Sequence, residues 1–78
     1  MNNRIIFCSF FKKNEKGLNH NPYQGKIGKR IYNEISEKAW NQWIKKQTIL
    51  INEKKLNMFN KQDRKIIEKE MQYFLFKQ

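Results

Sequence analysis

The sequence predicts an α+β fold in which a short N-terminal antiparallel β-hairpin packs on three α-helices. Three patterns support this prediction: an alternating β-branched and aromatic segment near the N-terminus, a long amphipathic stretch with both tryptophans, and another apolar stripe near the C-terminus. At 78 residues the chain is close to the size at which a single hydrophobic core is only just sufficient. Because no repeat or low-complexity linker divides it, we expect residues 1–78 to form one domain.

The hairpin is predicted from the first third of the sequence. Between Arg4 and Phe10 the alternation places Ile6 and Cys8 on one face of a strand. Lys12–Gly17 is polar and ends in glycine, which predicts a turn, and Leu18–Tyr23 is then expected to return as the second strand. Two strands alone are barely stable, so one face of the hairpin is expected to lie against the helices, above all the tryptophan helix.

Three helices are predicted after the Pro22–Gly25 segment, which interrupts regular structure. The first carries isoleucines every four residues, and Ser36 is the predicted N-cap of the second. The predicted apolar stripes are Ile27, Ile31 and Ile35 in the first helix, Trp40, Trp43, Ile44, Gln47, Leu50 and Ile51 in the second, and Ile67, Met71, Phe74 and Leu75 in the third. Leu56–Phe59 is expected to close the second helix, with Asn60 and Asp63 forming a capping box for the third.

The composition limits the classes of function. No apolar run approaches the roughly 20 residues that span a bilayer, and Ile5–Phe11 lacks the features of a signal peptide, so we expect a cytoplasmic protein without membrane contact. A single cysteine excludes an internal disulfide. No nucleophile–base–acid arrangement or phosphate-binding glycine loop is present, so we expect a protein that is not an enzyme.

A net charge of +10 is typical of proteins that bind phosphate-rich partners. However, 14 of the 17 basic residues are lysine, and isoleucine and asparagine each occur ten times. These residues have AT-rich codons, so a bias in base composition would produce the lysine excess without selection for binding. From the residues alone, this explanation and a functional basic surface both remain open. Both tryptophans fall on the apolar stripe and are predicted to be core residues, not platforms for base stacking. Nucleic-acid binding is therefore an alternative and not the favoured function.

Cys8 is the candidate residue for metal or redox chemistry. A thiolate is a soft metal ligand and a nucleophile, and the neighbouring Arg4, Lys12 and Lys13 would favour the thiolate over the thiol. The alternative is that Cys8 only fills space, because free cysteines are among the most buried residues. From the residues alone, both interpretations remain open.

Other ligand candidates are weaker. His20 would approach Cys8 across the predicted hairpin and add an imidazole, although a lone histidine near a proline turn is more often solvated. The carboxylates are hard oxygen donors suited to divalent metal ions, but no E-x-x-H or H-x-x-x-H spacing groups them, so most are expected to be surface charges. The carboxylates considered are Glu34, Glu37, Glu53, Asp63, Glu68 and Glu70, together with the neighbouring amide of Asn52.

A series of motifs resembles one bacterial family. The run G-K-R-I-Y-N-E-I-S at Gly28–Ser36 is followed by Ala39-Trp40, Trp43, Gln47-Thr48 and L-I-N-E-K-K-L-N-M at Leu50–Met58. Matching residues continue on both sides, at Arg4, Ile6, Phe7 and Cys8 and at Arg64, Glu68, Glu70, Met71 and Phe74–Phe76. This ordered set closely resembles the small bacterial Fe(II)-trafficking proteins known as the YggX family. Gln24 departs from the family pattern P-[FY]-P-G, in which the position is proline.

The resemblance implies a monomeric mediator of Fe(II) use that supports synthesis or repair of iron–sulfur clusters and limits oxidative damage to them. Cys8 occupies the position of the family's N-terminal cysteine, which is implicated in protection against oxidants. Iron would then be held weakly or transiently by Cys8 with water and oxygen donors, or the protein would act on an iron–sulfur partner protein. The alternatives are a basic nucleic-acid-binding module and an adaptor for cluster-assembly proteins that binds no metal.

Overall fold

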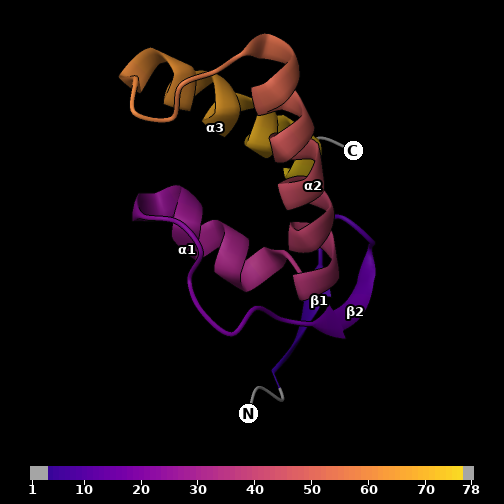
Figure 1. The fold of residues 1–78 in the computed structure, drawn as a ribbon. Coiled ribbons are helices and arrows are strands. Elements are labelled where there is room, and N and C mark those ends of the chain that lie inside the picture. Colours follow the sequence, from indigo (N-terminus) through magenta and orange to yellow (C-terminus); the bar gives the residue numbers. More distant parts are fainter. Residues whose placement is uncertain (1–3, 77–78) are drawn as a thin grey trace. The chain divides into compact units, whose positions relative to one another are not determined.

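The computed structural model describes residues 4–76 and contains one β-hairpin and three helices (Figure 1). The elements follow the order β1 (Ile5–Cys8), β2 (Lys13–Lys16), α1 (Gly25–Glu34), α2 (Glu37–Lys54) and α3 (Lys61–Phe76). This composition confirms the predicted α+β class. The chain divides into two compact units between Trp40 and Asn41. The first unit contains the hairpin, α1 and the start of α2, and the second contains the rest of α2 and α3.

The hairpin is confirmed, but its second strand lies earlier than predicted. Cys8 pairs with Lys13, and the antiparallel register continues to the pair of Ile5 and Lys16. The connection is a tight turn over residues 9–12, closed by a hydrogen bond of 2.7 Å from Lys12 N to Cys8 O. The prediction that Lys12–Gly17 is a turn and Leu18–Tyr23 a strand is therefore wrong. The polar β2 can pair because a strand needs only backbone partners, and three of its four residues are exposed to solvent.

Helix α1 begins at Gly25, the last residue of the Pro22–Gly25 segment after which the first helix was predicted. Ile31 and Ile35 are fully buried, whereas Ile27 is partly buried. Ile35 lies just beyond the last residue of the helix, in an extended conformation, and its N–H donates to Ile31 O. The apolar stripe therefore continues past the helix end, and this extended residue leads directly into Ser36.

Ser36 caps helix α2, as predicted from its residue type. Its Oγ accepts a hydrogen bond of 3.2 Å from Ala39 N, and the side chain is completely buried. On the predicted apolar stripe Trp43 is fully buried, but Ile44 is 38% exposed, so the prediction is wrong at Ile44. The helix ends with a hydrogen bond from Leu56 N to Ile51 O across Lys55, whose φ of 52° gives the left-handed turn that commonly terminates helices.

Helix α3 is capped by Asn60, whose Oδ1 accepts hydrogen bonds from Gln62 N at 2.8 Å and Asp63 N at 3.2 Å. The reciprocal half of the predicted capping box is wrong, because the Asp63 carboxylate accepts from Asn57 N instead. The predicted stripe is confirmed by the buried Ile67, Met71 and Leu75. The partly buried Phe74 places its ring 5.8 Å from that of Trp43, centroid to centroid. Within residues 4–76, each helix is too short or too polar to cross a bilayer.

Candidate functional site around Cys8

Cys8 is the last residue of β1, and its side chain is completely buried. Two segments that are far apart in the sequence meet at its sulfur: the hairpin turn that follows it and the start of α2. Ser36 N lies 3.3 Å from Cys8 Sγ and donates a hydrogen bond to it. A backbone bridge between Gly17 and Ser36 holds the chain after β2 beside the same point. Polar backbone groups therefore surround the thiol, although the other residues of β1 are apolar.

These donors change the acidity of the thiol. Burial alone would raise the pKa of Cys8, because a charged sulfur loses its hydration. Hydrogen bonds from the Ser36 hydroxyl and from the backbone N–H groups of Phe11, Ser36 and Phe10 outweigh this effect, so the pKa lies below its ordinary value of 9.0. The predicted cause was the charge of Arg4, Lys12 and Lys13; the structure instead assigns the shift to neutral donors. Such donors favour the thiolate, which is the reactive and metal-binding form of cysteine.

The turn that supplies two of these donors is attached to the end of α1. Ser9 N donates to Glu34 O at 2.7 Å, and Ser9 Oγ donates to Glu34 Oε1 at 3.3 Å. The Glu34 carboxylate also lies 3.6 Å from Nε of Arg30, one helical turn earlier. Because both the backbone and the side chain of Ser9 are held, the turn next to Cys8 has a defined position relative to α1.

Arg4, just before β1, connects the other end of this strand to neighbouring segments. Its Nη2 donates to Tyr32 O at 2.6 Å and to Leu18 O at 3.3 Å, and the guanidinium stacks over the Tyr32 ring at 3.8 Å. Arg4 O in turn accepts a hydrogen bond of 2.8 Å from Gly17 N. Arg4 thus joins the strand, the segment after β2 and α1, and it acts as a structural residue of the site.

The structure does not place His20 opposite Cys8. The strand partner of Cys8 is Lys13, and His20 lies in an exposed bend after β2. The predicted approach of His20 is therefore wrong, and the reason is the shifted second strand.

The carboxylates do not assemble into a metal site within the part of the chain that the structure describes. Over residues 4–76 no group of three or more His, Cys, Asp and Glu side chains could hold a metal ion. Several carboxylates have other partners: Glu34 pairs with Arg30, Glu37 lies 3.8 Å from Lys16 Nζ, and Asp63 accepts from Asn57 N. Asn52 and Glu53 are exposed on the last turns of α2. Any iron site within the described residues that uses Cys8 must therefore recruit water or distant oxygen donors.

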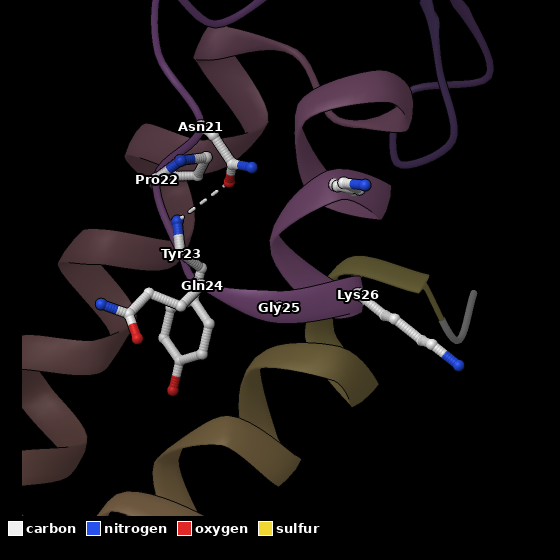
Figure 2. A pocket seen from close by; sticks show the side chains of 7 residues that line it. Asn21, Pro22, Tyr23, Gln24, Gly25 and Lys26 are labelled. Carbon is white, nitrogen blue, oxygen red and sulfur yellow. Dashed lines mark hydrogen bonds between the residues drawn. The ribbon is translucent and has the colours of Figure 1, made fainter.

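An open hollow of about 630 Å³ lies beside the start of α1 (Figure 2). It is lined by Asn21, Pro22, Tyr23, Gln24, Gly25, Lys26 and Lys29. Figure 2 shows the hydrogen bond from Tyr23 N to Asn21 Oδ1, which fixes the loop, and the Lys26 side chain extending away from the Tyr23 ring. The lining contains two lysines and neither carboxylate nor thiol, so its electrostatics oppose binding of Fe(II).

The tryptophan indoles provide little support for base stacking. Trp43 is completely buried, and Trp40 is partly buried. Trp43 is thus a core residue, as predicted, and its face is not available to a nucleic-acid base.

Sequence reasoning identified Cys8 but missed the groups that act on it. Ser36 was predicted only as a helix cap, yet its hydroxyl and N–H both contact the sulfur. The donors from the turn are backbone N–H groups, which cannot be recognised from residue types. A strand cysteine followed by a tight turn is the signal that could have indicated them, because successive N–H groups in a turn form an anion-binding concavity.

The low thiol pKa predicts how stability depends on pH. Because the pKa is lower in the folded than in the unfolded chain, deprotonation favours folding. The stability that Cys8 gains in this way is fully present above its unfolded pKa and is lost as the pH falls through the folded pKa. We therefore expect the difference in free energy of unfolding between the native protein and Cys8→Ser to increase with pH up to about 9. Urea unfolding of the reduced proteins across this pH range measures it.

A matched control is Cys8→Ala, which also removes the titrating group and should give the same pH trend despite a different loss of packing. A difference that stays constant with pH would mean that the thiol titrates identically in the folded and unfolded chains.

Comparison with known proteins places the whole sequence in one family. All 78 residues match the family model described as bacterial Fe(2+) trafficking. A protein of Buchnera aphidicola subsp. Acyrthosiphon pisum, named a probable Fe(2+)-trafficking protein, is 64% identical over 75 residues, which is 96% of this chain and 97% of the relative. A protein of Yersinia pestis (strain Pestoides F) with the same name is 63% identical over 73 residues, covering 94% of this chain and 81% of the relative. The chain belongs to the bacterial Fe(2+)-trafficking family.

Proposed function

We propose that this protein carries Fe(II), supplies it for the synthesis or repair of iron–sulfur clusters, and limits oxidative damage to them. Family membership supports the iron-trafficking part, since relatives of 63 to 64% identity are named probable Fe(2+)-trafficking proteins. The observation that carries the proposal in this chain is the Cys8 sulfur, which receives hydrogen bonds from the hairpin turn and from the start of α2 and has a lowered pKa. It acts as a mediator and not as an enzyme.

A single buried cysteine suits a carrier that must release its metal. Cys8 is 0% exposed, so Fe(II) can reach the sulfur only if residues that cover it move aside. Coordination then replaces the hydrogen bonds that stabilise the thiolate, and water or oxygen donors complete the ligand set. Because the metal competes with existing donors and lacks a preformed group of ligands among residues 4–76, its binding is weak and transient.

The same thiolate can consume an oxidant before it reaches a cluster. The sulfur attacks one oxygen of hydrogen peroxide, the O–O bond breaks, and hydroxide leaves with the electron pair, so that Cys8 becomes a sulfenic acid. The donors that stabilise the thiolate increase the fraction of sulfur available for this attack. Because Cys8 is buried, the reaction is restricted to small oxidants or to moments when the residues that cover the sulfur move aside.

The proposed function implies a cellular location and a set of partners for the protein. It would act as a cytoplasmic monomer and a single domain, with iron and iron–sulfur cluster proteins as partners. The strongly positive net charge of +10 disfavours self-association through like-charge repulsion.

An anaerobic Fe(II) titration with a competing chelator tests the role of Cys8. We expect saturable binding by the native protein and affinity at least about tenfold weaker for Cys8→Ser, the scale typical of losing a group that supports a metal site. Glu53→Gln is the matched control, because it removes an exposed oxygen donor of α2 and should leave the affinity unchanged. Circular dichroism confirms that all forms are folded.

Equal affinities for the native protein and Cys8→Ser would remove Cys8 from the iron site. If no form binds Fe(II), the proposal that the protein carries iron directly is wrong. The alternative of an adaptor for cluster-assembly proteins is then favoured.

The net charge favours nucleic-acid binding as the second candidate function. An affinity for nucleic acid that falls steeply with added salt, in a protein that shows no saturable binding of Fe(II), would support this alternative.

A further inference from the structure

The loop between α2 and α3, residues 55–60, exposes an aromatic side chain almost completely. Phe59 is 95% exposed, whereas the next most exposed large hydrophobic residues of the described chain, Tyr73 and Ile5, are 64% and 63% exposed. A phenyl ring in water gains nothing for the fold, since its burial is what stabilises a protein. The Phe59 ring is therefore accessible to a binding partner.

The loop holds its tip in a defined conformation. Asn57 Oδ1 accepts a hydrogen bond of 2.9 Å from Phe59 N, and Asn57 O accepts one of 2.9 Å from Asn60 N. The N–H of Asn57 is itself held at 2.8 Å by the Asp63 carboxylate. Both ends of the loop are fixed as well, by the left-handed residue Lys55 after α2 and by the Asn60 cap of α3. Little conformational entropy is lost when a partner binds a ring presented in this way.

Basic residues lie on both sides of Phe59 in the sequence. The exposed basic residues that flank the loop are Lys54, Lys55, Lys61, Arg64 and Lys65. The same stretch contains only two carboxylates, Glu53 and Asp63, and the second already accepts the Asn57 N–H. The loop therefore combines one exposed aromatic side chain with exposed basic residues before and after it in the sequence. An aromatic anchor with a charged periphery is a common composition of protein interfaces.

We propose that this loop docks onto an acidic protein surface with an apolar pocket that receives the Phe59 ring. Charge complementarity selects the partner: carboxylates around the pocket would attract the five basic side chains and speed association. A second copy of the chain does not fit, because two molecules of charge +10 repel each other. Single-stranded nucleic acid fits less well, since Phe59 is the only aromatic residue between Lys54 and Lys61, and such sites stack successive bases on several rings.

A photo-crosslinker tests the proposal in the full-length protein. The variant Phe59→p-benzoylphenylalanine is expressed in a bacterial host and irradiated, and the adducts are identified by mass spectrometry. The control places the same crosslinker at Ile49, which is 54% exposed on α2, outside the loop. We expect an acidic protein to be crosslinked from position 59 and not from position 49.

The identified protein is then purified and titrated with the native chain. Phe59→Ser should weaken binding at least about tenfold, as expected for an anchor residue, whereas Ile49→Ser should not. Lys61→Glu should also weaken the affinity for the partner, and by a larger factor at low salt than at high salt. Lys45→Glu, on α2 away from the loop, should have a smaller effect. Circular dichroism confirms that each variant is folded.

Every other outcome contradicts the proposal. Adducts with nucleic acid, adducts with a second copy, the same adduct from positions 49 and 59, or no adduct each exclude an acidic protein partner at this loop. A binding affinity that is unchanged in Phe59→Ser excludes the ring as the anchor.

Discussion

Gly28→Ala is expected to lower the free energy of unfolding by about 3 kcal/mol, at or above the upper end for overpacking of a core. Gly28 is buried in the first turns of α1. A Cβ added there would overlap the carbonyl oxygen of Tyr23 and lie 2.7 Å from Asn21 Oδ1. The obstacle is backbone, which cannot rotate away as a long side chain can, so the loop before α1 must shift. Urea unfolding followed by circular dichroism measures the loss.

Gly25→Ala is the matched control, because it adds the same methyl group three residues earlier. At Gly25 the added group meets backbone strain and not a steric overlap. Gly25 has a φ of 78° and nothing within 4 Å of an added Cβ. Only the strain of a left-handed conformation opposes that substitution, and it should cost about 1 kcal/mol. Equal losses at the two positions would show that the close approach to Tyr23 does not determine the effect at Gly28.

The helices could be predicted because their signals are local. Ser36 was identified as a cap from its residue type, and the spacing of Ile31 and Ile35 identified the buried face of α1. A cap and an apolar period depend on residues within a few positions of each other, so the sequence contains the necessary information. At Ile44 the same reasoning was wrong, because the width of a buried stripe depends on what covers it.

The second strand could not be predicted from residue types. β2 has the sequence Lys13–Lys16 and contains neither a β-branched nor an aromatic residue. Its pairing comes from β1 and from the tight turn, while ion pairs hold the partly buried Glu15 carboxylate at 3.2 Å from Lys13 and 3.9 Å from Lys38. A strand whose side chains are mostly in solvent has little intrinsic preference to reveal, so composition favoured the more apolar Leu18–Tyr23.

Only Cys8 itself, and not the groups around it, could be predicted from the sequence. Cys8 was evident as the single thiol, but its environment depends on backbone groups of Phe10 and Phe11 and on Ser36, 28 positions away. Only the folded chain brings these donors to one sulfur. The same displacement of the second strand explains why His20 was expected near Cys8 and lies elsewhere.

Trp43→Ala is expected to lower the free energy of unfolding by about 3 to 5 kcal/mol, the usual cost of truncating a large buried aromatic side chain. Trp43 is 0% exposed and is the largest of the completely buried side chains in the described chain. Its removal leaves a cavity beside Phe74, whose ring loses its aromatic partner at 5.8 Å. Thermal and urea unfolding give the change in stability, and the Cys8 pKa should be unaffected because Ser36 and the hairpin turn remain in place.

Trp43→Phe separates the contribution of ring volume from that of the indole N–H. Among the protein groups of residues 4–76, the buried Nε1 of Trp43 has no hydrogen-bond acceptor, and we expect this donor to carry a cost of desolvation. Phenylalanine removes that cost while keeping most of the aromatic contact, and we expect it to lose less than half of the stability lost by Trp43→Ala. If Trp43→Phe were as damaging as Trp43→Ala, the indole N–H would have to bind an acceptor such as an internal water. Hydrogen exchange at the indole would then show protection of Nε1 that persists until global unfolding.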